Sequence, residues 1–241
     1  MIVNYTEQGW EVITQRAHGL LAAQLALQWR LKDRPERWTE TLIAIADHDD
    51  AQIELQADDL LTPQGGPVNF KMKKFDAGHC RRLHELAISK SRYIALLMSM
   101  HMVFLHTAEA EENPKVKLFL KEQEKVQAKW RRELKISVVQ AQKAYELVEW
   151  CDAFSLLLAQ QEVQPEGRMI GISKGPDGKP YHMRQKPNGS LTVEPWPFEE
   201  DHFTLSLDAR VLATLQFKNC DQFKNEWAEA AVTEKVWQLE K

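Results

Sequence analysis

Residues 18–29 read HGLLAAQLALQW, and this stretch sets the architecture that we expect for most of the chain. Leu21, Leu25 and Trp29 follow His18 at positions i+3, i+7 and i+11, so all four side chains fall on one face of an α-helix. A histidine on an apolar helix face has to find a polar partner, because an unpaired buried polar group is costly. The stretch therefore predicts a buried helix that carries a functional or paired histidine.

The helical period continues through most of the first two thirds of the sequence. Before it, weakly alternating residues 1–14 surround a turn at residues 7–9 and predict a β-hairpin. Asn113-Pro114 has the composition of a helix N-cap and first turn. We expect further helices over residues 36–51, from about residue 76, from about residue 91, from residue 113, and over the segment that ends near residue 161.

After residue 164 the sequence becomes rich in Gly, Pro and alternating residues. Residues 187–190 read PNGS, a hairpin turn signal, and residues 203–207 alternate like a strand. A helix near residues 220–230 and a last strand near residues 232–239 complete this part. The predicted fold class is mainly α, with a helical domain at residues 1–163, an N-terminal β-hairpin, and a small β-rich α+β appendage at residues 164–241.

Composition narrows the classes of function. The chain has 241 residues and a formal net charge of -4, so there is no global basic field and nucleic acid is not an expected partner. Three widely spaced cysteines indicate neither a disulfide framework nor a cysteine zinc site, which favours a cytoplasmic location. No stretch approaches 18 uninterrupted apolar residues, so a membrane span is not expected either.

Several ionisable residues lie on the predicted apolar helix faces. Asp152 is flanked by Trp150 and Phe154, and a buried carboxylate must be paired, hydrogen-bonded or bound to a cation. The same need for a polar or charged partner applies to His18, His48, Asp49 and His101, which lie on three other predicted helices. Each residue alone is more often a satisfied core residue than a ligand. Their joint occurrence on four helices is what indicates a metal site.

Three segments of the chain together resemble the HD superfamily of metal-dependent phosphohydrolases. They are AHGLLA at residues 17–22, LIAIADHD at residues 42–49 and EWCDAFSL at residues 149–156. The resemblance covers roughly residues 15–160 and implies an HD-like helical bundle with His18, His48, Asp49 and Asp152 as metal ligands. The chain is also similar throughout its length to a bacterial domain of unknown function that carries a His-Asp-Asp segment and a Ser-x-His segment.

Imidazole and carboxylate ligands suit a divalent transition metal, which could be Fe, Mn, Co, Ni or Zn. His79 and His101 are similar to the additional histidines with which some HD proteins hold a second ion, so two ions are expected. His84 lies five residues after His79, and His106 lies five residues after His101. Helical phase favours His79 and His101 within these pairs.

The resemblance implies a hydrolase that acts on a small-molecule phosphoester or nucleotide-like substrate. His48 and Asp49 would be catalytic, and Arg82 would bind the substrate phosphate. Many HD members follow the doublet with an apolar residue, Gly and Lys, whereas residues 50–52 here read DAQ. Two alternatives stay open: a di-iron HD-type oxygenase, and a regulatory module that binds metal without turnover.

Overall fold

The computed structural model describes all 241 residues of the chain. Half of the residues are helical, and seven strands form one mixed sheet. The α-helices are α1 (Gln15–Leu27), α2 (Trp38–Asp47), α3 (Ala77–Lys90), α4 (Arg92–His106), α5 (Pro114–Leu134), α6 (Val138–Ala159) and α7 (Cys220–Glu229). The strands are β1 (Ile2–Thr6), β2 (Gly9–Ile13), β3 (Ile170–Lys174), β4 (Pro180–Gln185), β5 (Leu191–Glu194), β6 (His202–Leu212) and β7 (Val232–Glu240).

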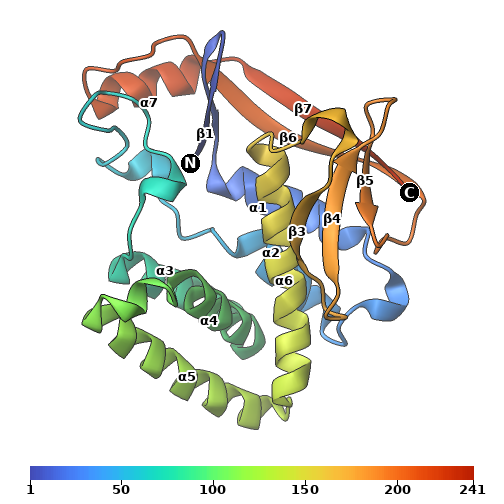
Figure 1. Cartoon of the computed structure of the whole chain (residues 1–241). Helices are drawn as coiled ribbons and strands as arrows, with labels where there is room; N and C mark the ends of the chain where they lie inside the picture. The colour runs from blue at the N-terminus through green and yellow to red at the C-terminus, as the bar shows by residue number, and fades with distance from the viewer.

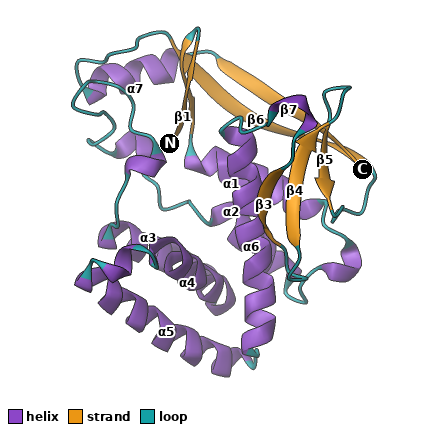
Figure 2. Cartoon of the chain, in the orientation of Figure 1, coloured by secondary structure: helices purple, strands orange, loops and turns teal.

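The seven strands follow the order β1-β2-β6-β7-β5-β4-β3 in the sheet. Every neighbouring pair is antiparallel except β5 and β7, which pair in parallel at Leu191 and Leu239. The sheet curls around α1 and α6, as Figure 1 shows, while α3, α4 and α5 stand on the other side of α6. Figure 2 shows the same view with the strands in orange and the helices in purple.

The expected mainly α fold class, a helical bundle with a small appendage, is therefore wrong. The N-terminal hairpin does not stand alone, because β2 pairs with β6 and places Glu11 opposite Val211. A two-stranded hairpin is marginal in water and becomes stable when further strands extend it. The strands from the two ends of the sequence satisfy each other's backbone groups in one sheet, and the protein is a mixed α and β structure.

One continuous core joins the helices to the sheet. Trp29, which follows the end of α1, and Trp150 of α6 meet edge to face with ring centroids 5.0 Å apart. Phe198, which precedes β6, lies against both rings at 6.3 and 5.9 Å, and Tyr181 of β4 also packs on Trp150. The expected boundary between residues 163 and 164 falls between α6 and β3, and residues on both sides of it share this core.

Helix ends follow the local signals in the sequence. Asn113 accepts a hydrogen bond from the backbone N–H of Lys115 and begins α5 with Pro114 in its first turn. Ser137 and Gln140 form a capping box at the start of α6. Both caps fix where the long helices begin, and α6 in turn carries Asp152 into the centre of the molecule.

Candidate metal centre

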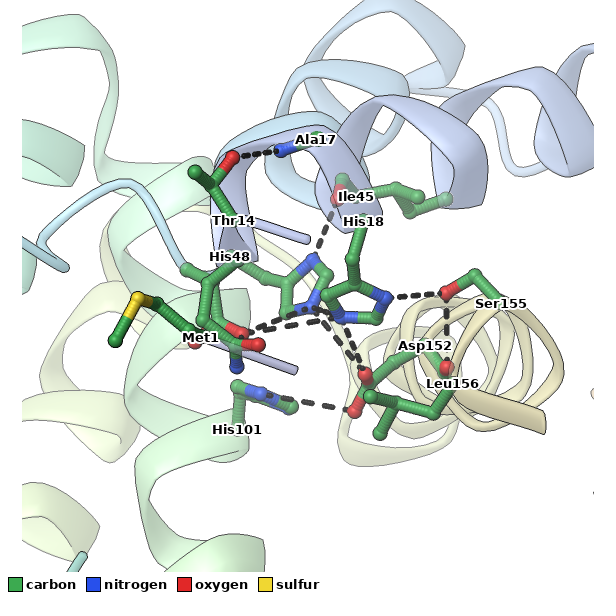
Figure 3. Close-up of polar contacts among 12 residues, drawn as sticks. Met1, Thr14, Ala17, His18, Ile45, His48, His101, Asp152, Ser155 and Leu156 are labelled. Carbon is green, nitrogen blue, oxygen red and sulfur yellow. Dashed lines mark hydrogen bonds and ion pairs between the residues drawn. The ribbon is translucent and has the colours of Figure 1, made fainter. Parts of the chain in front are cut away.

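Four helices bring one cluster of polar side chains into the core. His18 comes from α1, His48 and Asp49 from the end of α2, His101 from α4 and Asp152 from α6. All five residues are buried, and the three imidazoles are at most 1% exposed. Figure 3 shows His18 and His48 pointing toward one oxygen of the Asp152 carboxylate, with His101 facing the other oxygen. The structure therefore brings together five of the six side chains that were expected to bind metal.

A glycine allows α1 and α2 to approach each other closely at this cluster. A Cβ atom on Gly19 would lie 2.4 Å from the carbonyl oxygen of Ala46, well inside van der Waals contact. The same Cβ would be 4.0 Å from the His48 ring. Glycine normally weakens a helix interior, so its presence next to His18 is explained by close backbone contact.

The hydrogen bonds of His48 fix which of its ring nitrogens is free. His48 follows the last residue of α2, and its Nδ1 lies 2.7 Å from the carbonyl oxygen of Ile45. A carbonyl only accepts, so Nδ1 carries the proton. In the neutral ring the lone pair is therefore on Nε2, which faces the cluster. This contact also explains why α2 ends at Asp47 rather than at residue 51, because the side chain takes up one of the last helical carbonyls.

The same argument applies to His18. Its Nδ1 lies 2.8 Å from the hydroxyl oxygen of Ser155, and that hydroxyl donates its own proton to the carbonyl oxygen of Asp152 at 2.9 Å. Ser155 can then only accept from His18, so the His18 Nδ1 carries a proton as well. Neutral His18 and His48 thus both direct Nε2 lone pairs into the same small space.

These two lone pairs meet each other and a carboxylate. The Nε2 atoms of His18 and His48 are 2.9 Å apart, and Asp152 Oδ1 lies 3.1 Å from the first and 3.3 Å from the second. Asp49 Oδ2 lies 3.8 Å and 3.7 Å from the same two nitrogens. Converging acceptors repel unless a cation lies between or beside them. The cation can be a proton on an imidazole or a metal ion.

The pKa values describe the protonated alternative. Burial opposes a charge on His48, but the carboxylates of Asp152 and Asp49 raise the pKa of His48 to about 9. Burial alone would raise the pKa of Asp152, yet His48 and His18 hold it well below its usual range. For His101, burial dominates and lowers the pKa to about 4, so this ring is neutral and able to act as a ligand.

The donor set fits a metal ion. Two donors bound at about 2.1 Å to one ion lie about 3.0–3.4 Å apart at octahedral or tetrahedral angles, close to the separations among His18, His48 and Asp152. Two groups of three residues place their ligand atoms within 4.8 Å of one another: His18, His48 and Asp49, and His48, His101 and Asp152. The structure thus contains buried His and Asp clusters that could hold a metal ion.

A large pocket opens onto this cluster. Its volume is about 960 Å³, and Asp49, His101 and Asp152 form part of its lining. This volume is at the upper end of the range for small-molecule sites. Another part of the lining comes from the segment between α2 and α3 and from the start of α3. This part includes Phe70, Met72, Lys73, Lys74, Phe75, His79 and Arg82.

The remaining expected site residues lie on the pocket wall. His79 lines the pocket but belongs to neither group of possible ligands, and burial lowers its pKa. Arg82 also lines it, 3.9 Å from Asp76, and its buried Nε has no hydrogen-bond partner in the protein. Of the alternative histidines, His84 stacks on Trp130 away from the site, whereas His106 lines the same pocket.

Sequence reasoning missed the side chains that support the cluster. Ser155 orients His18, and Gln15 donates from Nε2 to Asp49 Oδ2 at 2.8 Å. The role of Gly19 could have been predicted, because a glycine inside an apolar helix pattern suggests that another backbone approaches closely there. Ser155 lies three residues after Asp152 and therefore on the same side of α6, but nothing local identifies His18 as its partner.

None of the helices combines the length and apolar character that crossing a membrane requires.

Comparison with known families corrects the resemblance described above. Neither the curated proteins nor the solved structures contain a match to this chain. The family model described as "Protein of unknown function (DUF3891)" matches residues 1–214. Assignment to the HD superfamily is wrong, because this other family model covers most of the chain and the helices are built onto a curled seven-stranded sheet. The chain belongs to the DUF3891 family.

Proposed function

We propose that this protein is a metal-dependent hydrolase that acts on a small-molecule phosphoester or nucleotide. The observation that carries the proposal is the convergence of His18 Nε2, His48 Nε2 and Asp152 Oδ1 within 3.3 Å of one another, where Asp152 also lines a pocket of about 960 Å³. Buried acceptors placed this close need a cation, and a pocket gives that cation access to a ligand.

The first ion would be held by His18, His48, Asp49 and Asp152. Imidazole nitrogen and carboxylate oxygen together favour Mn, Fe, Co, Ni or Zn over Mg, which prefers oxygen ligands. The fixed Nδ1–H groups of both histidines support this role, because a bound imidazole usually donates its other N–H to a neighbouring acceptor. Ile45 and Ser155 supply those acceptors.

A second ion would need donors beyond this set. His48 has one free nitrogen, so it serves only one of the two groups of possible ligands. His101 is neutral, and its Nε2 lies 4.0 Å from Asp152 Oδ2, the carboxylate oxygen not used above. His79 lines the pocket and experiences the charge of Asp49. We therefore propose that His79 and His101, together with Asp152, would hold a second ion.

The chain's own residues would provide substrate binding and proton transfer. A divalent ion would make water a better nucleophile at neutral pH and offset charge on the phosphoryl oxygens. Asp49 lines the pocket and would accept a proton from water, while His48 would help to hold the ion. Arg82, Lys73 and Lys74 on the pocket wall would bind the phosphate by charge-assisted hydrogen bonds.

The test compares two histidine variants on a panel of phosphomonoesters and phosphodiesters with added Mn²⁺, Co²⁺ or Ni²⁺. We expect metal-dependent turnover that His48→Ala abolishes. His84→Ala is the matched control, because His84 stacks on Trp130 outside the pocket and should keep activity. Metal-loaded protein without turnover on any ester would reject the hydrolase and leave a metal-binding module.

A further inference from the structure

Gln15 occupies a rigid position at the edge of the candidate metal centre. It is the first residue of α1, follows the N-cap Thr14 and is only 4% exposed. Its backbone N–H lies 3.0 and 3.2 Å from the two carboxylate oxygens of buried Glu54. The main chain is therefore anchored at this point by Glu54.

The orientation of the Gln15 amide follows from its contact with Asp49. Nε2 lies 2.8 Å from Asp49 Oδ2, and an ionised carboxylate can only accept, so the nitrogen must face Asp49. This leaves the carbonyl oxygen Oε1 buried without any hydrogen-bond donor from the protein. Gln15 lines the pocket together with Asp49 and Asp152.

A buried carbonyl without a donor is unfavourable for stability, and an apolar side chain would avoid it. The presence of glutamine here is explained if its two amide atoms serve the site. Nε2 holds the Asp49 carboxylate at 3.7–3.8 Å from both Nε2 atoms of the histidine pair. Oε1 remains an unused acceptor on a side chain that lines the pocket.

We propose that Gln15 is a positioning residue of the metal centre: it holds the Asp49 carboxylate in place as a ligand and accepts a hydrogen bond from a donor in the pocket. The inference rests on the proposed function, since it requires a metal at this cluster. The donor is either the hydrolytic water or a hydroxyl or amine of the substrate. An amide does not take up a proton near neutral pH, so Gln15 orients this donor while Asp49 acts as the base.

The first experiment titrates metal-free protein with Mn²⁺ alone. Gln15→Met keeps the side-chain length and removes both amide atoms. We expect its Mn²⁺ affinity to fall by about 10–100-fold, the usual effect of removing a partner that orients a ligand. Its melting temperature in chelator should change little, because removal of the unpaired carbonyl offsets loss of the hydrogen bond to Asp49. A fall in melting temperature with unchanged affinity would show a merely structural role and overturn the proposal.

Gln24→Met is the matched control. Gln24 lies on the same helix, but both of its amide atoms bond the backbone of Ser206 in β6, at 2.9 and 3.1 Å. This variant should lower the melting temperature and leave Mn²⁺ affinity unchanged. If Gln15→Met does not fold, Gln15→Asn, which keeps the amide and shortens its reach, gives the same comparison.

A double-mutant cycle shows whether Gln15 acts through Asp49. In an Asp49→Asn background, Gln15→Met should change Mn²⁺ affinity by less than about twofold, because the group that it positions is already altered. An undiminished effect in that background would overturn the proposed role. If wild-type protein binds Mn²⁺ and Gln15→Met binds it equally well, only the Gln15 inference fails, whereas a wild type that binds no metal removes the proposed function as well.

Water-proton relaxation at saturating Mn²⁺ distinguishes the two donors without any substrate. A rate that differs between Gln15→Met and Gln24→Met assigns the donor to water. Equal rates exclude water as the donor.

Discussion

At the scale of single residues, the site is defined by two histidine ring nitrogens that carry no proton when the rings are neutral. Ile45 and Ser155 hold the Nδ1 protons of His48 and His18, so the two Nε2 atoms face each other at 2.9 Å as acceptors. Asp152 adds a negative charge beside them. A proton or a metal ion must therefore occupy this space, and the two compete for it.

This competition predicts a pH dependence for the metal-free protein. Despite burial, Asp152 and Asp49 raise the pKa of His48 from 6.5 to about 9. A raised pKa gives stability that is complete below pH 6.5 and is lost as the pH rises through about 9. We expect the melting temperature in chelator to fall across this range and the fall to be smaller with bound metal. A melting temperature that stays level in chelator would contradict the charge assigned to His48.

Asp152→Asn tests the carboxylate directly. The amide keeps the size of the side chain but removes its charge, so metal affinity should fall by more than the roughly 10–100-fold that outer partners contribute. Asp47→Asn is the control, because Asp47 pairs with Lys90 at 3.1 Å outside the cluster. Elemental analysis of both variants measures the effect. Retention of metal and of thermal stability in Asp152→Asn would remove Asp152 from the ligands.

The sequence allowed the cluster to be predicted because helical phase identifies polar residues on apolar faces. His18, Asp152 and His101 all carry that signal, and the structure brings them to one place. The supporting residues carry no such signal. Gln15 is the first residue of its helix, and its partner Asp49 is 34 positions away, so only the packing of α1 on α2 reveals the contact.

At the scale of secondary-structure elements, the contact between α1 and α2 controls the distance between His18 and His48. Gly19→Ala would place a Cβ atom 2.4 Å from the Ala46 carbonyl oxygen and force the helices apart. Overpacking of this kind typically costs about 1–3 kcal/mol. We expect a lower free energy of unfolding in denaturant titrations together with weaker metal binding.

Gly189→Ala is an informative comparison for Gly19→Ala. Gly189 lies in the turn between β4 and β5 at φ 87°, and a Cβ there would have no neighbour within 4 Å. Alanine should destabilise the protein there through the backbone but leave metal affinity unchanged. If Gly19→Ala also left metal affinity unchanged, the helix contact would not control the site.

Element boundaries were predicted best where a capping residue marks them. The N-caps Ser91 and Asn113 begin α4 and α5 near the expected positions. The end of α2 was placed too late, because the apolar period continues past Asp47 while the His48 side chain bonds the backbone of Ile45. A hydrogen bond from a side chain to the backbone at the end of its own helix does not change the spacing of apolar residues, so hydrophobic periodicity does not reveal it.

At the scale of the whole molecule, the sheet could not be assembled from the sequence alone. Each strand signal is short and local, whereas the pairing of β2 with β6 joins residues about 200 positions apart. The hairpin at residues 1–14 and the alternating tail were both expected, but as separate parts. The error was to treat a hairpin as independent when two strands alone are marginally stable.

This pairing predicts that the helical part does not fold alone. A fragment of residues 1–163 would lose β6 beside β2 and expose Trp29 and Trp150, which pack against Phe198. Each of these large aromatic side chains contributes about 1.5–3 kcal/mol when buried, a large share of the stability of a typical domain. We expect the fragment to aggregate or to lack a cooperative thermal transition. Cooperative unfolding of the isolated fragment would instead establish residues 1–163 as an independent domain.

The proposed site requires that His18, His48 and Asp152 hold a metal ion. The most direct measurement is elemental analysis of protein purified without chelator and then reconstituted anaerobically with Mn²⁺, Fe²⁺ or Co²⁺, for the wild type, His48→Ala and His84→Ala. We predict at least one tightly bound ion per chain in the wild type and in His84→Ala, and a marked loss in His48→Ala. Fewer than about 0.2 ions per chain in the reconstituted, folded wild type would contradict the claim.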